Sequence, residues 1–223
     1  MTTTPEGQEL EKRKSEEKDK ETRNRILAAA QELFMRYGFK SITMDEIARH
    51  LGVSKKTIYQ HFEDKDAIVC ECIASHMDCE KCTAAEVFSK ASNPVEEFLI
   101  EAQHLKMTFN MVHPTIIFEL RKYHPKAWAI FQEHKEKWMI RSIVENLKKG
   151  METGYYRPDI EPEILARLRM EQMAVGFDPT VFPNGRFELK TIQLQFIEHF
   201  IHGILTNKGR DFFNSHLQNT HEK

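Results

Sequence analysis

Apolar residues recur every three to four positions along the first third of the chain, the spacing that places side chains on one face of an α-helix. The first such stripe consists of Ile26, Leu27, Ala30, Leu33, Phe34 and Tyr37. Gly38 follows it and can adopt the left-handed conformation that ends helices, with Phe39 as the apolar residue that folds back. The pattern predicts a helix that runs from about residue 25 to residue 37.

Cap residues mark three further helices. Thr43 and Glu46 have the spacing of a capping box, in which each side chain bonds the backbone amide of the other residue. Gly52 is predicted to end this second helix. Ser54 and Asp64 are the predicted caps of the third and fourth helices.

The junction of the second and third helices predicts a helix-turn-helix. Ala48, Gly52 and Ile58 lie where two steeply crossing helices need a small contact, a permissive turn residue and a buried anchor. Residues 47–62 contain three Lys or Arg and no Asp or Glu. This local positive charge favours a DNA-binding motif over a generic helical hairpin.

Overall charge excludes proteins that coat nucleic acid by uniform basicity, since 32 Lys and Arg face 34 Asp and Glu, for a net charge of −2. Any DNA contact must therefore be local. In a helix-turn-helix, the start of the second helix enters the major groove, so Lys55, Lys56 and Thr57 are the predicted base-reading residues. Tyr59 and His61 are predicted to donate to phosphates.

Two more phosphate contacts are predicted at helix starts. Thr43 lies at a helix N-terminus, where free amides and the helix dipole favour an anion. Lys65 begins the fourth helix and is placed to hold the backbone from the other side. Taken singly, each of these residues has the alternative of being an ordinary solvated side chain.

The segment from about Arg25 to Ile68 closely resembles the N-terminal domain of TetR-like transcriptional regulators. The residues that carry the resemblance are Phe34, Gly38, Thr43, Ile47, Ala48, Gly52, Val53, Ser54, Thr57, Ile58, Tyr59, His61, Phe62 and Lys65. The resemblance implies an all-α homodimer whose paired third helices read a palindrome. It also implies a protein that usually represses until a small molecule binds its C-terminal domain.

By position, the resemblance assigns phosphate contacts to Thr43, Tyr59, His61 and Lys65. It assigns groove contacts to the segment from Ser54 to Thr57. Lys56 departs from many members of the family, which have a small residue before the threonine. This lysine adds a positive charge at the groove. The operator sequence does not follow from these residues.

Proline dipeptides divide the rest of the chain, because the residue before proline is disfavoured in a helix. They are Asn93-Pro94, His113-Pro114, His124-Pro125, Arg157-Pro158 and Asp178-Pro179. They predict about six helices after the DNA-binding unit, and so an all-α fold of about nine helices.

The last long helix has a wide apolar face, formed by Leu189, Ile192, Phe196, Ile197, Phe200, Ile201, Ile204 and Leu205. Together with the segment 164–177 it can form a four-helix interface across a two-fold axis. The alternative is an ordinary core helix of a monomer. Dimerisation is favoured, because reading a palindrome requires two half-sites at a fixed spacing.

The middle of the chain is rich in aromatic, Met and His residues, a composition that suits a mostly apolar pocket with a few polar groups. The candidate ligand-binding residues are His104, Met107, Phe118 and Trp138. For any one of them, a place in the hydrophobic core is the competing interpretation.

Four cysteines, Cys70, Cys72, Cys79 and Cys82, are clustered and are interpreted as thiols rather than disulfides. On a continuous helix, Cys72, His76 and Cys79 share a face near Cys82, which suggests metal or redox sensing. However, ten helical residues from Cys72 to Cys82 span about 15 Å, too far for one tetrahedral ion. Thiols used as small apolar residues are the favoured alternative, and neither a metal nor a cofactor is predicted.

The predicted organisation is a charged, disordered or frayed lead (1–20), a helix-turn-helix DNA-binding domain (21–66) and a C-terminal effector-binding and dimerisation domain (67–223). The chain lacks both a signal peptide and a membrane-spanning apolar run, so a cytoplasmic protein with no membrane partner is expected. Catalytic motifs are also lacking, so an enzyme is not expected.

The sequence therefore predicts a sequence-specific transcriptional regulator with double-stranded operator DNA, a second copy of itself and an unknown small-molecule effector as partners. Repression relieved by the effector is the favoured mode. The alternatives are a thiol- or metal-responsive regulator on the same scaffold, and a structural DNA-binding protein without an effector.

Overall fold

The computed structural model describes residues 5–221, with the side chains of all of these except 5–8, 10, 87, 88 and 217–221. Within these residues the regular secondary structure is helical, apart from two isolated β-bridges, and no helix is long and apolar enough to cross a bilayer. The elements are α1 (Pro5–Tyr37), α2 (Met44–Leu51), α3 (Lys55–His61), α4 (Lys65–Lys90), α5 (Pro94–Phe109), α6 (Ile116–Tyr123), α7 (Pro125–His134), the π-helical segment η1 (Lys135–Met139), α8 (Ile140–Glu152), α9 (Pro162–Gly176), α10 (Leu189–Ile204) and α11 (Asn207–His221).

The all-α prediction is confirmed. Since α7, η1 and α8 follow one another without a break, they form one continuous helix, and the described chain then has ten helices against about nine predicted. The five proline dipeptides all fall at breaks. Pro94 and Pro125 begin α5 and α7, and the other three dipeptides lie in the turns after α5, α8 and α9.

The predicted last helix ends one residue early and is followed by α11. Leu205 leaves the helix with extended backbone angles and forms an antiparallel bridge with Tyr156. The amide of Thr206 donates to the carbonyl oxygen of Tyr155 at 3.0 Å. These backbone bonds to the turn after α8 interrupt the helical ladder, which periodicity alone does not reveal.

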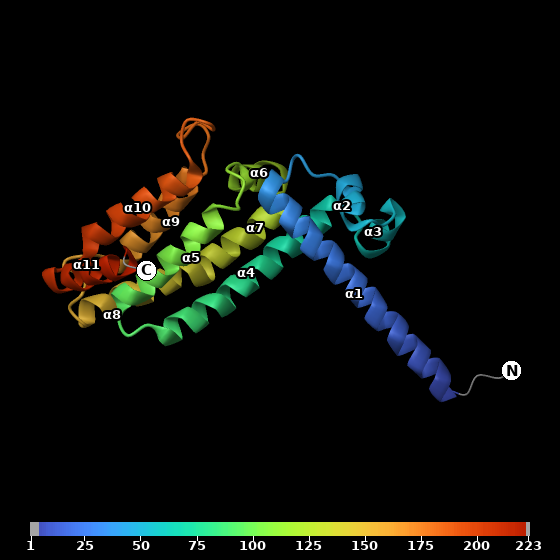
Figure 1. Ribbon diagram of the computed structural model, residues 1–223, viewed down its shortest axis with the longest axis horizontal. Helices are drawn as coiled ribbons and strands as arrows, with labels where there is room; N and C mark the ends of the chain where they lie inside the picture. Colours follow the sequence, from blue (N-terminus) through green and yellow to red (C-terminus); the bar gives the residue numbers. More distant parts are fainter. Residues whose placement is uncertain (1–4, 222–223) are drawn as a thin grey trace.

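The charged lead, expected to be disordered or a frayed helix, is helical where the structure describes it. Residues 5–20 form the first half of α1, and residues 1–4 lie outside the described part. Extending an existing helix avoids the cost of nucleation. Exposed pairs between Glu9 and Arg13 and between Lys12 and Glu16 add i,i+4 support. This half of α1 projects away from the other helices (Figure 1).

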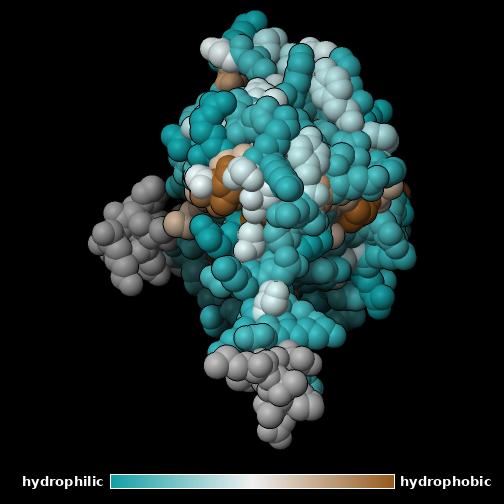
Figure 2. Space-filling view, turned by 90° about the vertical axis from the view of Figure 1, so that its right-hand side faces the viewer, coloured by the Kyte–Doolittle hydropathy of each residue, from teal (hydrophilic) through white to brown (hydrophobic). Residues whose placement is uncertain are grey.

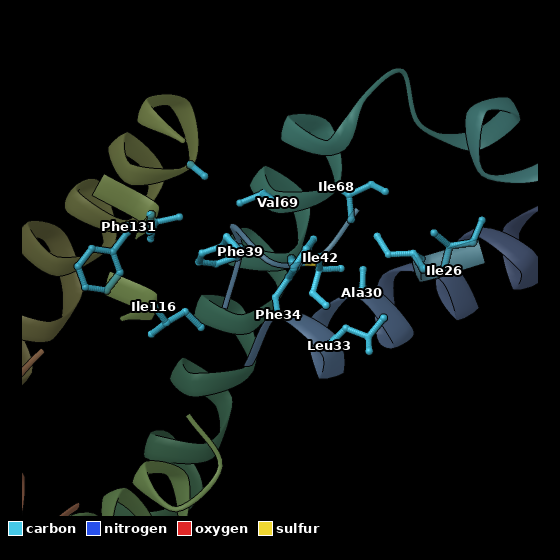
Figure 3. Close-up of a cluster of buried hydrophobic side chains, with 14 of the residues drawn as sticks. Ile26, Ala30, Leu33, Phe34, Phe39, Ile42, Ile68, Val69, Ile116 and Phe131 are labelled. Carbon is cyan, nitrogen blue, oxygen red and sulfur yellow. The ribbon is translucent and has the colours of Figure 1, made fainter. Parts of the chain in front are cut away.

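The largest hydrophobic core joins the helix-turn-helix to the helices that follow it. Phe39 is buried between the ring of Phe34, at 5.1 Å between centroids, and the ring of His124, at 5.4 Å. Figure 3 shows Phe39 between Phe34 on α1 and Phe131 on α7, with Val69 of α4 nearby. The proposed boundary between residues 66 and 67 lies inside α4, and the core continues across it.

Helix α4 runs from the helix-turn-helix to the far end of the C-terminal helices (Figure 1). It packs against α1, α5 and α7, and the contact with the start of α7 includes a 2.5 Å hydrogen bond between Asp66 and His124. One uninterrupted helix therefore belongs both to the N-terminal unit and to the C-terminal bundle.

Candidate DNA-binding site and internal cavity

Local chemistry fixes the start of α2 as predicted. The amide of Thr43 donates to Glu46 Oε2 at 2.6 Å, and the amide of Glu46 donates to Thr43 Oγ1 at 3.2 Å. This is the expected capping box. Because Thr43 donates to the carboxylate from its backbone and its hydroxyl, the pKa of Glu46 lies below its usual value.

The turn between α2 and α3 also follows the prediction. Gly52 ends α2 in the left-handed conformation, with φ 68°. The hydroxyl of Ser54 accepts from the amide of Thr57 at 3.1 Å and so caps α3. Ile47 and Ile58 are fully buried, and Ala48 lies between the two helices. The helix-turn-helix is therefore present, and its two helices are held by a packed apolar contact.

The outer side of α3 carries most of the predicted DNA-reading residues. Lys55, Lys56 and Tyr59 are exposed, and Thr57 is partly buried with its hydroxyl 2.8 Å from that of Ser54. Figure 2 views the molecule from the side on which α3 lies and shows a largely hydrophilic face. The structure thus presents a lysine pair, two hydroxyl side chains and a phenol on one side of the motif.

Lys55 forms an ion pair with Asp45, an acid that precedes the acid-free segment 47–62 in the sequence. Its Nζ lies 2.9 Å from Oδ1 of Asp45 on α2. The hydrogen bond to Asp45, and then the charge of Asp45, raise the pKa of Lys55. A carboxylate from outside residues 47–62 therefore lies beside Lys55 and offsets part of the local positive charge.

Lys65 is fixed at the start of α4. Its ammonium donates to the carbonyl oxygen of Phe39 and lies 5.9 Å from the ring centroid of Phe34. Partial burial lowers the pKa of Lys65, although the carboxylates of Glu119, Asp66 and Glu46 act in the opposite direction. Thr43 is exposed at the start of α2, and Lys65 is partly buried at the start of α4. Their contacts with phosphates remain a prediction.

His61 is the one predicted DNA contact that the structure does not bring to this surface. Its side chain is only 6% exposed, and Nδ1 lies 3.6 Å from Oδ1 of Asp19 on α1. The reason is the extended first half of α1, which passes the end of α3. Arg23 of the same helix forms an ion pair with Glu71 and lies over the ring of Phe62, 4.7 Å from its centroid.

A cavity of about 130 Å³ lies among α4, α5, η1, α8, α9 and α10. Its walls are mostly apolar and aromatic, with a small number of charged and polar side chains. Two of the four predicted ligand-binding residues, His104 and Trp138, line it. The cavity occupies the bundle around the second half of α4.

The other two predicted ligand-binding residues are placed elsewhere, which corrects that part of the prediction. Met107 is 69% exposed near the end of α5, and Phe118 is exposed on α6 with Lys122 beside its ring. Composition indicated a pocket, but which turn of each helix faces inward depends on packing that composition does not encode.

The four cysteines of α4 differ in how far they are buried. Cys72 is buried and its thiol donates weakly to the carbonyl oxygen of Leu27 at 3.7 Å, while Cys79 and Cys82 are exposed. Burial raises the pKa of Cys72 to about 12. Among the described residues, no three His, Cys, Asp or Glu side chains are arranged to hold a metal ion. His76 and the cysteines near it therefore form no such group.

The apolar faces of α9 and α10 are used differently. On α10, Ile192, Ile197 and Ile201 are buried within the chain itself, so the predicted wide face of this helix serves the core. On α9, Ile164 and Leu168 are 65% and 48% exposed and lie one turn apart. An exposed apolar stripe is therefore found on α9 rather than on α10.

Known proteins resemble both the motif and the whole fold. The family model for bacterial regulatory proteins of the TetR family matches residues 26–72. The HTH-type transcriptional repressor KstR2 of Mycobacterium tuberculosis is 24% identical over 194 residues, which cover 84% of this chain and 94% of the relative. This chain is a helix-turn-helix transcriptional regulator that resembles the TetR family.

Two solved structures share the fold of the regulator. A TetR-family regulator from Agrobacterium tumefaciens aligns with a TM-score of 0.71 at 15% identity, over 84% of this chain and all of that one. A transcriptional regulator from Saccharomonospora viridis, solved in complex with choline, aligns with a TM-score of 0.66 at 18% identity, over the same shares. At these identities the likeness establishes the fold of the regulator alone.

Proposed function

We propose that this regulator is a homodimeric repressor that leaves a palindromic operator when a small molecule enters its internal cavity. The observation that carries this proposal is the continuity of α4. This helix begins at Lys65, beside the DNA-reading helix, and its residues Glu80, Thr83 and Ala84 form part of the cavity wall. A shift of α4 caused by a ligand therefore acts directly on the position of α3.

The DNA contacts that we propose follow the exposed side of the motif. Lys55, Lys56 and Thr57 read base edges, since lysine donates to guanine and threonine bonds a base edge or contacts the thymine methyl group. The remaining contacts are to phosphates. We assign them to Thr43, Tyr59 and Lys65, and we place Ser54 with the groove contacts. We leave His61 out because its side chain faces α1.

The homodimer is proposed on the exposed stripe of α9. Ile164, Leu168 and Val175 are exposed and lie on one side of this helix. Polar residues of α10, including Gln195 and His199, are exposed on the neighbouring helix. A two-fold pairing of α9 and α10 would cover the apolar stripe and place two copies of α3 on successive major grooves.

Release requires two states with different affinities for the ligand. A ligand that binds both states equally shifts nothing, so the effector must prefer the state in which the two α3 helices no longer match the operator. The names of relatives support two parts of this proposal. KstR2 is a repressor, and the Saccharomonospora viridis regulator holds choline. Such a protein acts on the chromosome, and we therefore expect it in the cytoplasm.

The test is a fluorescence-anisotropy titration against the upstream DNA of the regulator's own gene and a scrambled duplex, at several salt concentrations. Lys56→Ala and Tyr59→Phe are the variants, and Lys148→Ala, an exposed lysine on α8, is the control. We expect selective, salt-dependent binding, a loss of about 1–3 kcal/mol per half-site for Lys56→Ala, and no loss for Lys148→Ala. Equal affinity of both duplexes for the wild type would instead indicate a structural DNA-binding protein.

A second candidate function is thiol sensing, favoured by the place of the exposed cysteines. Cys79 and Cys82 lie on the turns of α4 that also contribute Glu80 and Thr83 to the cavity wall. Modification there would displace α4 at the same point as a ligand. If this candidate is right, a thiol-alkylating reagent releases operator DNA from the wild type and not from Cys79→Ser/Cys82→Ser.

A further inference from the structure

The cavity contains a buried arginine, and one nitrogen of its guanidinium has no hydrogen-bond partner among the described residues. Arg169 of α9 is only 7% exposed and lines the cavity. In the described part of the chain no group accepts a hydrogen bond from its Nη1, which is fully buried. A buried charged donor that is left unpaired is costly, so an acceptor that reached this guanidinium would be strongly favoured.

A carboxylate balances the charge of Arg169 without contacting it. Glu101 of α5 also lines the cavity and interacts electrostatically with Arg169, but the two side chains do not come within the 4.0 Å of an ion pair. Glu101 is exposed to solvent on one side, whereas Arg169 is buried. The cavity therefore holds two opposite charges that are near one another and not joined.

The other polar groups near the cavity are largely occupied. His104 Nε2 lies 3.5 Å from Oε1 of Glu80, and both side chains line the cavity. Asn146 donates to Glu97 at 2.8 Å and accepts from the hydroxyl of Tyr156 at 3.1 Å. Of the described side chains that line the cavity, Arg169 is the one with a fully buried polar atom that has no hydrogen-bond partner.

We infer that the cavity binds an uncharged, largely apolar molecule that presents an oxygen acceptor, such as a carbonyl, to the guanidinium of Arg169. Aromatic walls from Phe98, Trp138 and Phe200 accommodate the apolar body. The acceptor occupies the space beside Arg169 and Glu101. This ligand class rests on the proposed function only in that the same cavity is taken as the effector site.

Charge excludes the two neighbouring ligand classes. A carboxylate ligand would satisfy Arg169 but would bring a third negative charge beside Glu101 and Glu80, which repel it. An ammonium ligand would suit these two acids but would leave Arg169 without an acceptor and place a cation beside it. An uncharged acceptor meets the need of Arg169 and adds no charge.

The test uses three apolar bodies, naphthalene, biphenyl and a ten-carbon chain, each carrying a methyl ketone, a carboxylate, an aminomethyl group or an ethyl group. Binding to the full-length protein without DNA is followed by tryptophan fluorescence, since Trp138 lies in the wall. For at least one body we expect the ketone to bind about tenfold or more tightly than its three counterparts, as a hydrogen bond from a charged donor provides.

Substitutions test whether the preference for the ketone depends on Arg169. Arg169→Met should reduce the affinity for the ketone to that for the hydrocarbon, and Arg169→Lys should retain part of the preference. Arg167→Met, which removes an exposed arginine of the same helix bonded to Glu136, is the matched control and should change nothing. Ala102→Phe, which fills the cavity from α5, should abolish binding of the whole series.

The inference is overturned if a carboxylate or an ammonium compound binds most tightly, if no compound binds, or if Arg169→Met keeps the ketone preference. The order in which the wild-type protein binds the four compounds of each apolar body tests the inference even if a variant fails to fold. A failure of the proposed effector role gives a different result from a failure of the proposed ligand class. A ketone that binds selectively without changing operator affinity supports the ligand class and refutes the proposed release, whereas a charged compound that releases DNA does the reverse.

Discussion

The backbone amide of Lys40 donates a 2.7 Å hydrogen bond to the carboxylate of Glu119, which lies 79 positions further along the chain. The same carboxylate accepts from the hydroxyl of Thr115 at 2.8 Å and is buried. It therefore ties the segment between α1 and α2 to the first turn of α6. This is a polar connection between the DNA-binding motif and the C-terminal bundle.

Removing that carboxylate should destabilise the protein. Glu119→Ala leaves the amide of Lys40 without its acceptor, at a cost of about 1–3 kcal/mol. Glu119→Gln keeps an acceptor oxygen and should cost less. Urea unfolding measures both, and Glu145→Ala, an exposed acid on α8, is the control. Equal stability of Glu119→Ala and the wild type would show that the bond to Lys40 contributes nothing.

Two glycines with the same left-handed backbone should respond differently to alanine. Gly38 has φ 80°, and a Cβ there would lie 2.8 Å from Oε2 of Glu119, whereas Gly52 has φ 68° and open space around it. Gly52→Ala should cost only the strain of the left-handed conformation, about 1–2 kcal/mol. Gly38→Ala should cost more in the free energy of unfolding.

A double-mutant cycle separates the two contributions at Gly38. In the Glu119→Ala background the clash is gone, so Gly38→Ala should then cost about as much as Gly52→Ala. If the cost of Gly38→Ala is the same in both backgrounds, the close approach to Glu119 has no energetic consequence.

The capping box should make stability depend on pH. The pKa of Glu46 is lowered in the folded protein, chiefly by the hydrogen bond from the backbone of Thr43. Its contribution is therefore fully present above the unfolded-state value of about 4.3 and is lost as the pH falls through the lower folded value. The advantage of the wild type over Glu46→Gln should shrink below about pH 4.

The measurement is the midpoint of urea unfolding between pH 3 and pH 7 for wild type and Glu46→Gln. Glu63→Gln, which alters an exposed acid between α3 and α4, is the matched variant. An advantage of the wild type that did not vary over this pH range would contradict the assigned role of the Glu46 carboxylate.

Thiol reactivity should separate the four cysteines. Cys79 and Cys82 are exposed and should react rapidly with a disulfide reagent such as dithiobisnitrobenzoate. Partial burial raises the pKa of Cys70, and Cys72 is buried with a pKa of about 12, so these two should react slowly or only after unfolding. Cys79→Ser/Cys82→Ser should lack the fast phase, and a rapid reaction of Cys72 would refute its burial.

The α9 interface can be tested by adding charge to it. Leu168→Glu should weaken the dimer about 100-fold or more, because an unpaired charge buried at an interface costs about 3–5 kcal/mol. Light scattering after size-exclusion chromatography, over a range of protein concentrations, measures the change. Val181→Glu, at an exposed position in the loop after α9, should not alter it. A dimer of unchanged strength in Leu168→Glu would place the interface elsewhere.

Sequence alone predicted the parts of this fold that depend on neighbouring residues. The capping box of Thr43 and Glu46, the turn at Gly52 and the caps at Ser54 and Asp64 all follow from side chains and amides a few positions apart. They fixed the helix-turn-helix and most of its exposed face.

Features that depend on distant segments were not predictable in the same way. The bond of Lys55 to Asp45 crosses the turn of the motif, and His61 is turned inward by a part of α1 that was expected to be disordered or frayed. Arg169 became a candidate only once α5 and α9 were seen to face one cavity. Periodicity gives the buried face of a helix but not the helix that covers it.

The unbroken course of α4 makes it a stiff lever. From Lys65 to Glu80 it spans about 22 Å, at about 1.5 Å per residue. A tilt of only about 5° about the cavity end would move its first turn by about 2 Å, enough to break a hydrogen bond to a phosphate, which weakens steeply beyond about 3.2 Å. In the proposed homodimer the two displacements would add across the half-site spacing, so a small change around the cavity would be enough to misalign the two α3 helices with the operator.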